Sequence, residues 1–262
     1  MSEKQIRTLV AGNWKMHGLR AQLVEIEGIA QSVRENPVDV DVLVCVPTTL
    51  IARAVHAANS LIEIGGEDCS AEEAGPFTGD IDAEMLRDAG ATSVILGHSE
   101  RRQGHHETDA MVAVKAKAAW RHGLATIICI GETLAQRRAG DALQVCGKQL
   151  AASLPDMPAG AQTSIAYEPL WAIGSGTTPT LDDIVAVLAY IRAALETRFG
   201  SAARPIRILY GGSVEPGNAG AILGVPNVGG LLIGGASLLA ADFNAILNVA
   251  HVRVRTAGLG NF

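Results

Sequence analysis

The chain has 262 residues, of which 48% are hydrophobic and 18% are charged, and its formal net charge is −6 at pH 7. This length suits one large domain or two small ones, and the apolar content is ample for a sizeable core. The acidic balance argues against a nucleic-acid-binding protein, whose surface would show basic clustering.

The N-terminal stretch MSEKQIRTLV lacks the long apolar core of a signal peptide, and no apolar run reaches the length of a membrane span. The cysteines are scattered, with no pair at the spacing of a zinc or redox motif. We therefore expect a soluble, reduced, cytoplasmic protein with no nucleic-acid or membrane partner. The cysteines are Cys45, Cys69, Cys129 and Cys146.

Short apolar runs predict strands, and each is followed by a stretch of helical character. In chain order the eight runs are 8–14, 41–47, 61–69, 92–99, 124–131, 163–169, 206–213 and 229–235. Most of them are continuously apolar, as expected of parallel strands that are buried on both faces.

The segments between these runs carry helix signals. Thr133 with Gln136 three residues later fits a capping box, and Thr180 with Asp183 offers a weaker one. The apolar residues after Thr180 keep helical spacing as far as Phe199.

No linker, low-complexity segment or change in composition divides the chain. Eight strand–helix units favour a closed (β/α)8 barrel, an α/β fold, over an open doubly wound sheet. We therefore predict one barrel domain over residues 1–262. Residues 251–262 would form a C-terminal tail beyond the last helix, and we assign no role to it.

Polar residues follow the predicted strands at their carboxyl ends, where barrel enzymes carry their catalytic groups. Taken singly, each has a plain structural explanation, such as a surface charge or a turn. Because all strands of a barrel end at one mouth, we expect these residues to form one site. They are Asn13 and Lys15 after the first run, His98 and Ser99 after the fourth, Glu168 after the sixth, Ser213 after the seventh and Gly234-Gly235 after the eighth.

The stretch AYEPLWAIGSG (166–176) suggests a catalytic base. Tyr167 is typical of the end of a buried strand, Glu168 sits where the strand leaves the core, and Pro169 has no N–H for the ladder. The glycines of GSG (174–176) indicate a loop that can close over the carboxylate and exclude water. On this stretch alone, a surface glutamate in a turn is an equally good interpretation.

The surrounding residues suit an anionic, enolisable substrate. The glycines of GGS (211–213) and GG (234–235) permit close backbone approach at the usual phosphate position of such barrels. Residues 236–237 would open a helix whose N–H groups attract an anion. Lys15 supplies a positive charge, and His98 can donate to a developing oxyanion. We find no plausible set of metal ligands at the mouth.

Six separated motifs make the sequence similar to the triosephosphate isomerase family. They are GNWKM (12–16), GHSERR (97–102), CIGET (129–133), AYEPLWAIGSG (166–176), YGGS (210–213) and GGAS (234–237), and they occur in order between about residue 6 and residue 250. The resemblance implies a TIM barrel and an isomerase of glycolysis and gluconeogenesis. Such an enzyme interconverts dihydroxyacetone phosphate and D-glyceraldehyde 3-phosphate without a cofactor.

The resemblance also implies a role for each site residue. Glu168 moves a proton between C1 and C2, neutral His98 polarises the carbonyl and shuttles protons between the oxygens, and Lys15 stabilises the enediolate. The implied substrate-binding residues are Asn13, Lys15, Gly174, Ser175, Ser213, Gly234 and Gly235, with Ser99, Glu100 and Thr78 in support.

In this family the loop that corresponds to GPFTGD (75–80) docks on a partner subunit, so the resemblance implies a homodimer in which Thr78 reaches toward the other active site. The apolar Phe77 at the loop tip fits an interface, although it could instead fold back on its own barrel. One departure affects this expectation, because Glu67 and Asp68 replace the usual Gln-Asn pair before the loop. Dimer strength is then expected to depend on pH.

Three other functions stay open at this point. An isomerase of a four-carbon ketose phosphate would share the acid–base residues but need a remodelled lid, and the family-like AIGSG (172–176) argues against it. A barrel kept only as a phosphate-binding or scaffold protein would not need Lys15, His98 and Glu168 together. A metal-dependent sugar-phosphate epimerase would need ligands at the mouth. The lid ends in TTP (177–179) where the family more often has KTA, which predicts altered opening kinetics.

Overall fold

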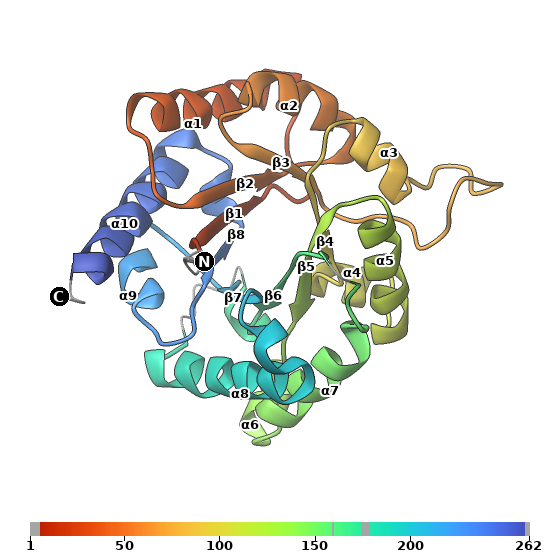
Figure 1. Ribbon diagram of the computed structural model, residues 1–262, viewed down its shortest axis with the longest axis vertical. Coiled ribbons are helices and arrows are strands. Elements are labelled where there is room, and N and C mark those ends of the chain that lie inside the picture. The colour runs from red at the N-terminus through yellow and green to blue at the C-terminus, as the bar shows by residue number, and fades with distance from the viewer. Residues whose placement is uncertain (1–5, 159, 174–178, 260–262) are drawn as a thin grey trace.

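Eight parallel strands close into a barrel in the computed structural model, which describes residues 6–158, 160–173 and 179–259. Strands that follow one another in the chain are neighbours, and β8 pairs with β1 to complete the ring. The helices form an outer layer around the strands (Figure 1). The prediction of a single-domain (β/α)8 barrel is confirmed.

The strands are β1 Leu9–Asn13, β2 Asp41–Cys45, β3 Glu63–Gly66, β4 Ser93–Leu96, β5 Ala125–Ile130, β6 Thr163–Tyr167, β7 Arg207–Tyr210 and β8 Gly230–Ile233. The helices are α1 Leu23–Glu35, α2 Ile51–Ala58, α3 Ala83–Asp88, α4 Ser99–Gly104, α5 Asp109–Arg121, α6 Leu134–Arg138, α7 Ala142–Ser153, α8 Leu181–Phe199, α9 Ala219–Leu223 and α10 Ala240–Leu259.

Both faces of the strands are buried, as their continuous apolar sequences predict. Alternate side chains, among them Leu9, Ala11 and Cys129, belong to a cluster made only of strand residues. The intervening side chains, such as Val10, pack in a second cluster that also contains the helix residues. The centre of the barrel is therefore a packed core and not a channel.

The two predicted capping boxes are present. Thr133 accepts the Gln136 N–H at 3.3 Å, and the Gln136 side chain accepts the Thr133 N–H at 2.8 Å. Thr180 and Asp183 exchange the same two bonds at 3.2 Å each. These contacts satisfy N–H groups that have no partner inside a helix, and α6 and α8 begin at the residues that follow the caps.

The last helix is longer than the sequence pattern indicates. It runs without a break to Leu259, so the expectation that the segment from residue 251 lies beyond the last helix is wrong. Contacts hold the helix to the barrel past residue 250: Val254 packs against the outer cluster, and His251 Nδ1 accepts the Asp39 N–H at 2.9 Å. Within the described ranges, no helix is long and apolar enough to cross a bilayer.

Closure of the ring depends on close backbone contact at Gly230. This residue of β8 is paired with Leu9 of β1 on one side and with Leu209 of β7 on the other. A Cβ atom at Gly230 would lie 2.0 Å from the Leu9 carbonyl oxygen, so no side chain fits there unless the strands move apart.

We expect Gly230→Ala to destabilise the protein by on the order of 1–3 kcal/mol, because the added methyl group forces β8 away from β1. Gly217→Ala is the matched control, since Gly217 is exposed and no atom lies within 4 Å of the Cβ it would gain. Thermal unfolding of both variants measures the effect. Equal melting temperatures would show that the pairing of β8 with β1 accommodates a side chain without strain.

Candidate active site

A cavity of about 230 Å³ opens at the carboxyl ends of the strands. Its walls come from the segments that follow β1, β4, β6, β7 and β8. Predicted residues that are far apart in the chain therefore meet at one mouth. Those that line the cavity are Asn13, Lys15, His98, Glu168, Ser213, Gly234 and Gly235.

Glu168 occupies the turn directly after β6, and only 2% of its surface is exposed. Its backbone N–H donates to the Ile130 carbonyl at 2.8 Å, and Pro169 then ends the strand pairing. The carboxylate is held at both oxygens. Oε1 lies 2.9 Å from Nε2 of His98, and Oε2 accepts the Ser99 backbone N–H at 3.0 Å.

His98 is the N-cap residue of α4, and its ring is bound on both sides. Nδ1 accepts the backbone N–H of Glu100 at 3.2 Å, so this nitrogen carries no proton. We therefore assign the ring proton to Nε2, which donates to Glu168. In this arrangement His98 is a neutral imidazole with an N–H at the cavity wall.

For both Glu168 and His98, burial and the neighbouring contacts shift the pKa in opposite directions. Burial raises the pKa of Glu168, but the His98 ring and the Ser99 N–H stabilise the carboxylate and hold that pKa below its usual 4.5. Burial lowers the pKa of His98, and the adjacent Glu168 carboxylate more than offsets this and raises it above 6.5. A second ring proton would sit on Nδ1 and face the Glu100 N–H. We therefore assign an ionised Glu168 beside a neutral His98.

Lys15 has a left-handed backbone conformation, with φ of 59°. This conformation is uncommon for a residue with a side chain and persists where neighbours hold it. Asn13 contributes by accepting the Lys15 backbone N–H at 3.1 Å through its side-chain oxygen. The Lys15 ammonium lies 2.6 Å from Oε1 of Glu100, so this predicted supporting residue contacts the lysine directly.

The last two strands contribute backbone at the cavity, as predicted. Gly234 lies beside the Lys15 side chain, and a Cβ there would come within 3.8 Å of its ammonium nitrogen. The sequence placed residues 236–237 at the start of a helix, but they belong to the 3-10 turn Gly235–Ser237, and α10 begins only at Ala240. A tight turn of backbone next to a cation still suits an anionic group.

Part of the predicted lid lies outside the described residues. Gly174 and Ser175, both expected to bind substrate, are among them, as is the segment 174–178 as a whole. The start of the lid is described: Pro169 leads into the 3-10 turn Leu170–Ala172.

Glu132 is a fully buried glutamate after β5 that was not among the predicted site residues. Its carboxylate accepts the Tyr167 hydroxyl at 3.1 Å and the Trp171 ring N–H at 3.0 Å. It thereby joins the end of β5 to the end of β6 and to the start of the lid. The signal was in the sequence, because Glu132 follows the fifth apolar run much as Glu168 follows the sixth.

The loop 75–80 does not line the cavity of its own chain. It belongs to the segment between β3 and α3, which projects away from the ring of helices (Figure 1). Phe77 at its tip is 41% exposed, and Thr78 is exposed as well. The predicted supporting residue Thr78 is therefore not brought to the site within one subunit.

The two acids before this loop lie in different surroundings. Asp68 is paired with Lys115 at 2.8 Å and with Arg101 at 2.9 Å, and burial raises its pKa although Lys115 opposes the shift. Glu67 has a buried Oε1 for which the described part of the chain provides no hydrogen-bond partner. Burial raises the pKa of Glu67 to about 8, so its neutral form predominates at pH 7.

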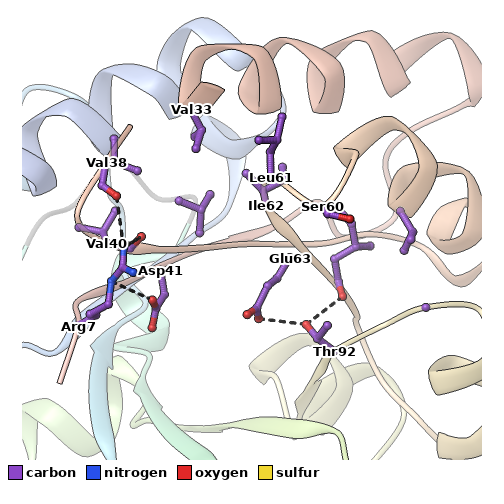
Figure 2. A pocket seen from close by; sticks show the side chains of 14 residues that line it. Arg7, Val33, Val38, Val40, Asp41, Ser60, Leu61, Ile62, Glu63 and Thr92 are labelled. Carbon is purple, nitrogen blue, oxygen red and sulfur yellow. Dashed lines mark hydrogen bonds and ion pairs between the residues drawn. The ribbon is translucent and has the colours of Figure 1, made fainter. Parts of the chain in front are cut away.

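A second cavity, of about 480 Å³, lies at the opposite end of the strands (Figure 2). Valines make up much of its wall, and its polar side chains contact one another: Arg7 lies 3.2 Å from Asp41, and Thr92 donates to Glu63 at 3.0 Å. No histidine is among the described residues that line it. Acid–base chemistry like that of Glu168 and His98 therefore has no counterpart there.

Within the described ranges, no three His, Cys, Asp or Glu side chains are grouped so that they could hold a metal ion.

Comparisons with known proteins show similarity to triosephosphate isomerases. The family model described as triosephosphate isomerase matches residues 8–250. Triosephosphate isomerases of Ruegeria sp. (strain TM1040) and Afipia carboxidovorans are each 56% identical to the chain, over 92% of its length and 97% of theirs. The crystal structure of triosephosphate isomerase from Bartonella henselae is 45% identical and superimposes with a TM-score of 0.87, covering 93% of this chain and 99% of that one.

The raised pKa of Glu67 predicts how stability depends on pH. The folded protein holds this proton more tightly than the unfolded chain, so the contribution of Glu67 to stability is fully present below the ordinary pKa of 4.5 and is lost as pH rises from there through about 8. We expect Glu67→Gln, which cannot ionise, to raise the melting temperature at about pH 8 and to change it little at about pH 5. Glu72→Gln, on an exposed residue of the following loop, is the control. A gain from Glu67→Gln that is the same at every pH would contradict the assignment.

Proposed function

The chain belongs to the triosephosphate isomerase family and interconverts dihydroxyacetone phosphate and D-glyceraldehyde 3-phosphate, and we propose that Glu168, His98 and Lys15 carry out this reaction. One observation carries the assignment of roles. A buried carboxylate lies 2.9 Å from an imidazole nitrogen at the wall of a cavity that also holds a lysine.

Glu168 is the base in this proposal. Its pKa is lowered, so it is ionised at neutral pH, and its burial leaves few water molecules to compete for the proton it accepts. It takes a proton from the carbon next to the substrate carbonyl and returns it to the neighbouring carbon. Between these steps the substrate is an enediolate.

His98 acts on the oxygens. Its Nε2–H, which contacts Glu168 in this structure, would donate to the substrate oxygen when the carboxylate turns to the carbon. The Glu100 N–H at Nδ1 favours the neutral ring, which can donate a proton to one oxygen and recover it from the other. A developing negative charge is then met by a preoriented donor.

Lys15 and the glycine turns bind the charged parts of the substrate. The ammonium lies beside Gly234 and can stabilise both the enediolate and the phosphate dianion, and Asn13 keeps the lysine backbone in place. We place the phosphate at Ser213 and Gly235, with Gly174 and Ser175 of the lid closing over it. No observation favours the four-carbon ketose phosphate as the substrate.

Glu168→Asp tests the base. The substitution keeps the carboxylate but withdraws it by about 1 Å, and a displacement of this size can lower the rate on the order of 100-fold. We expect a large fall in kcat and a smaller change in KM with D-glyceraldehyde 3-phosphate as substrate. Glu215→Asp, on an exposed carboxylate that lines the same cavity, should leave kcat unchanged. A Glu168→Asp enzyme with normal turnover would show that another group is the base.

We also propose a homodimer that forms through the loop 75–80, with Thr78 of the partner subunit near Lys15. Exposed apolar side chains support it: Phe77 at the loop tip is 41% exposed, and Met16, next to Lys15, is 98% exposed. The proposal includes a cytoplasmic location, in keeping with four buried cysteines that form no disulfide.

Shortening the loop 75–80 should give monomers with impaired activity, because the site loses the support of the second subunit. Phe77→Asp should also shift the protein toward monomers, because it places a charge in an apolar contact. Val252→Asp is the control, since Val252 is also an exposed apolar residue but lies on α10. Sedimentation and activity are measured on the same samples. An unmodified protein that is monomeric and fully active would overturn this assembly and leave the isomerase assignment intact.

A further inference from the structure

Arg102 of α4 has contacts that its place in the GHSERR motif does not reveal. Its Nε donates to the Gly97 carbonyl at 2.7 Å, and its Nη2 donates to the Cys129 carbonyl at 3.0 Å. The rest of the guanidinium is held by Asp109 at 2.5 Å and by the Ser153 hydroxyl at 3.0 Å. The side chain is only 16% exposed, so these are largely desolvated contacts.

The two carbonyls lie where the pairing of β4 with β5 stops. The last paired residues are Leu96 and Ile128, and Gly97 and Cys129 are the next residues in the same register. Two carbonyls cannot bond to each other, and the guanidinium supplies the donors that they need. Arg102 thus extends the connection between the two strands by one residue beyond the ladder.

Both carbonyls are adjacent to the reacting residues. The Gly97 carbonyl belongs to the peptide bond that leads into His98. Cys129 precedes Ile130, whose carbonyl accepts the Glu168 backbone N–H at 2.8 Å. Any opening between β4 and β5 at this level would therefore change the separation of His98 and Glu168.

Arg102 also anchors α4, whose first turn binds both side chains. The Ser99 N–H donates to Glu168 at 3.0 Å, and the Glu100 N–H donates to His98 at 3.2 Å. Arg102 lies one turn further along this six-residue helix. A helix of this length has little stability of its own and takes its position from such tertiary contacts.

From these contacts we propose that Arg102 is a positioning residue for the isomerisation: by bridging the Gly97 and Cys129 carbonyls it holds His98 and Glu168 at their working separation. The inference rests on the roles proposed for His98 and Glu168. Lysine cannot replace arginine here, because one ammonium group cannot reach two carbonyls, a carboxylate and a hydroxyl in the fixed geometry of a guanidinium fork.

The side chains around Arg102 fit a guanidinium group. The Ser153 hydroxyl accepts from Nη2 and donates to Asp109 at 2.8 Å, so all three side chains form one network. Gly97 has a φ of 65°, and a Cβ at this position would lie 3.0 Å from Nη2. A side chain at Gly97 would therefore crowd both Val112 and the guanidinium.

The test compares Arg102→Lys with Arg192→Lys. Arg192 is a matched control, because it also donates to two carbonyls, those of Ala203 at 3.0 Å and Ile206 at 2.7 Å, but lies on α8 away from the cavity. For Arg102→Lys we expect kcat to fall roughly 10- to 100-fold, with KM within about threefold of the unmodified enzyme. For Arg192→Lys we expect a lower melting temperature and an unchanged kcat.

The pH profile separates positioning from general loosening. The Ser99 N–H stabilises the ionised form of Glu168, so loss of this bond raises the pKa of Glu168. The acid limb of kcat/KM should therefore move to higher pH in Arg102→Lys and stay in place in Arg192→Lys. Two outcomes would overturn the proposal. One is an Arg102→Lys enzyme whose acid limb does not move and whose kcat stays within about threefold of normal, and the other is an equal loss of kcat in both variants.

Asp109→Asn covers the case in which Arg102→Lys does not fold. It keeps the guanidinium and both carbonyls but removes the carboxylate that orients them. We expect a smaller fall in kcat than for Arg102→Lys, and this is measurable without that variant. Where Arg102→Lys does fold, adding Asp109→Asn to it should lower kcat no further. A further fall of the same size in the double variant would contradict the mechanism, and so would an Asp109→Asn enzyme with normal kcat.

Nitrogen-15 NMR of the His98 ring separates failure of this proposal from failure of the proposed function. It reports on the ring and its carboxylate partner without any turnover, so it is informative even if Glu168 proves not to be the base. We expect the His98 signals to change in Arg102→Lys and to stay unchanged in Arg192→Lys. Identical His98 signals in the unmodified protein and in Arg102→Lys would show that the bonds from Arg102 to the Gly97 and Cys129 carbonyls do not position the ring.

Discussion

The pairing of β8 with β1 is the constraint on which the rest of the molecule depends. It turns a sheet with two edges into a ring in which every strand has two neighbours and all carboxyl ends meet at one mouth. It also brings the turn after β8 to the residues after β1: the Trp14 ring N–H donates to the Ser237 carbonyl at 2.9 Å, and Lys15 lies beside Gly234. One backbone pairing therefore both closes the fold and places a cation next to the glycine turn that follows β8.

Two glutamates near the mouth show how surroundings decide what a buried carboxylate does. Burial opposes ionisation in both, because the charged form loses its hydration. At Glu168 the His98 ring and the Ser99 N–H replace that hydration, and the pKa falls below 4.5. At Glu67 one oxygen has no partner in the described part of the chain, and the pKa rises to about 8. The first group is suited to act as a base at neutral pH, and the second holds its proton.

The short helix α4 connects these electrostatics to the fold. Its first residues supply the backbone N–H groups that orient His98 and Glu168. Arg102, one turn later, attaches the same helix to the ends of β4 and β5. Donors fixed in advance by covalent and tertiary structure need little reorganisation when charge develops on a substrate, which is the usual source of electrostatic catalysis.

Much of this protein was determined by its sequence alone. Continuous apolar runs separated by helical patterns predicted the closed barrel, because a strand buried on both faces needs helices around it. Glu168, His98 and Lys15 were predicted from their places after strands and from the family motifs. The two capping boxes were also predicted correctly, because they depend on residues only three positions apart.

Only the tertiary structure decided the contacts between residues that are distant in the chain. Three features depend on which carbonyls and side chains the barrel brings within 4 Å: the buried contacts of Glu132, the Glu67 oxygen that lacks a partner among the described residues, and the bonds from Arg102 to two carbonyls. The last helix extends to Leu259, where the sequence pattern had predicted a tail, and His251 and Val254 contact the barrel within that stretch. A local pattern reports how a segment can fold and which face is apolar. The partners that set a pKa or hold a side chain come from other strands, and chain closure selects them.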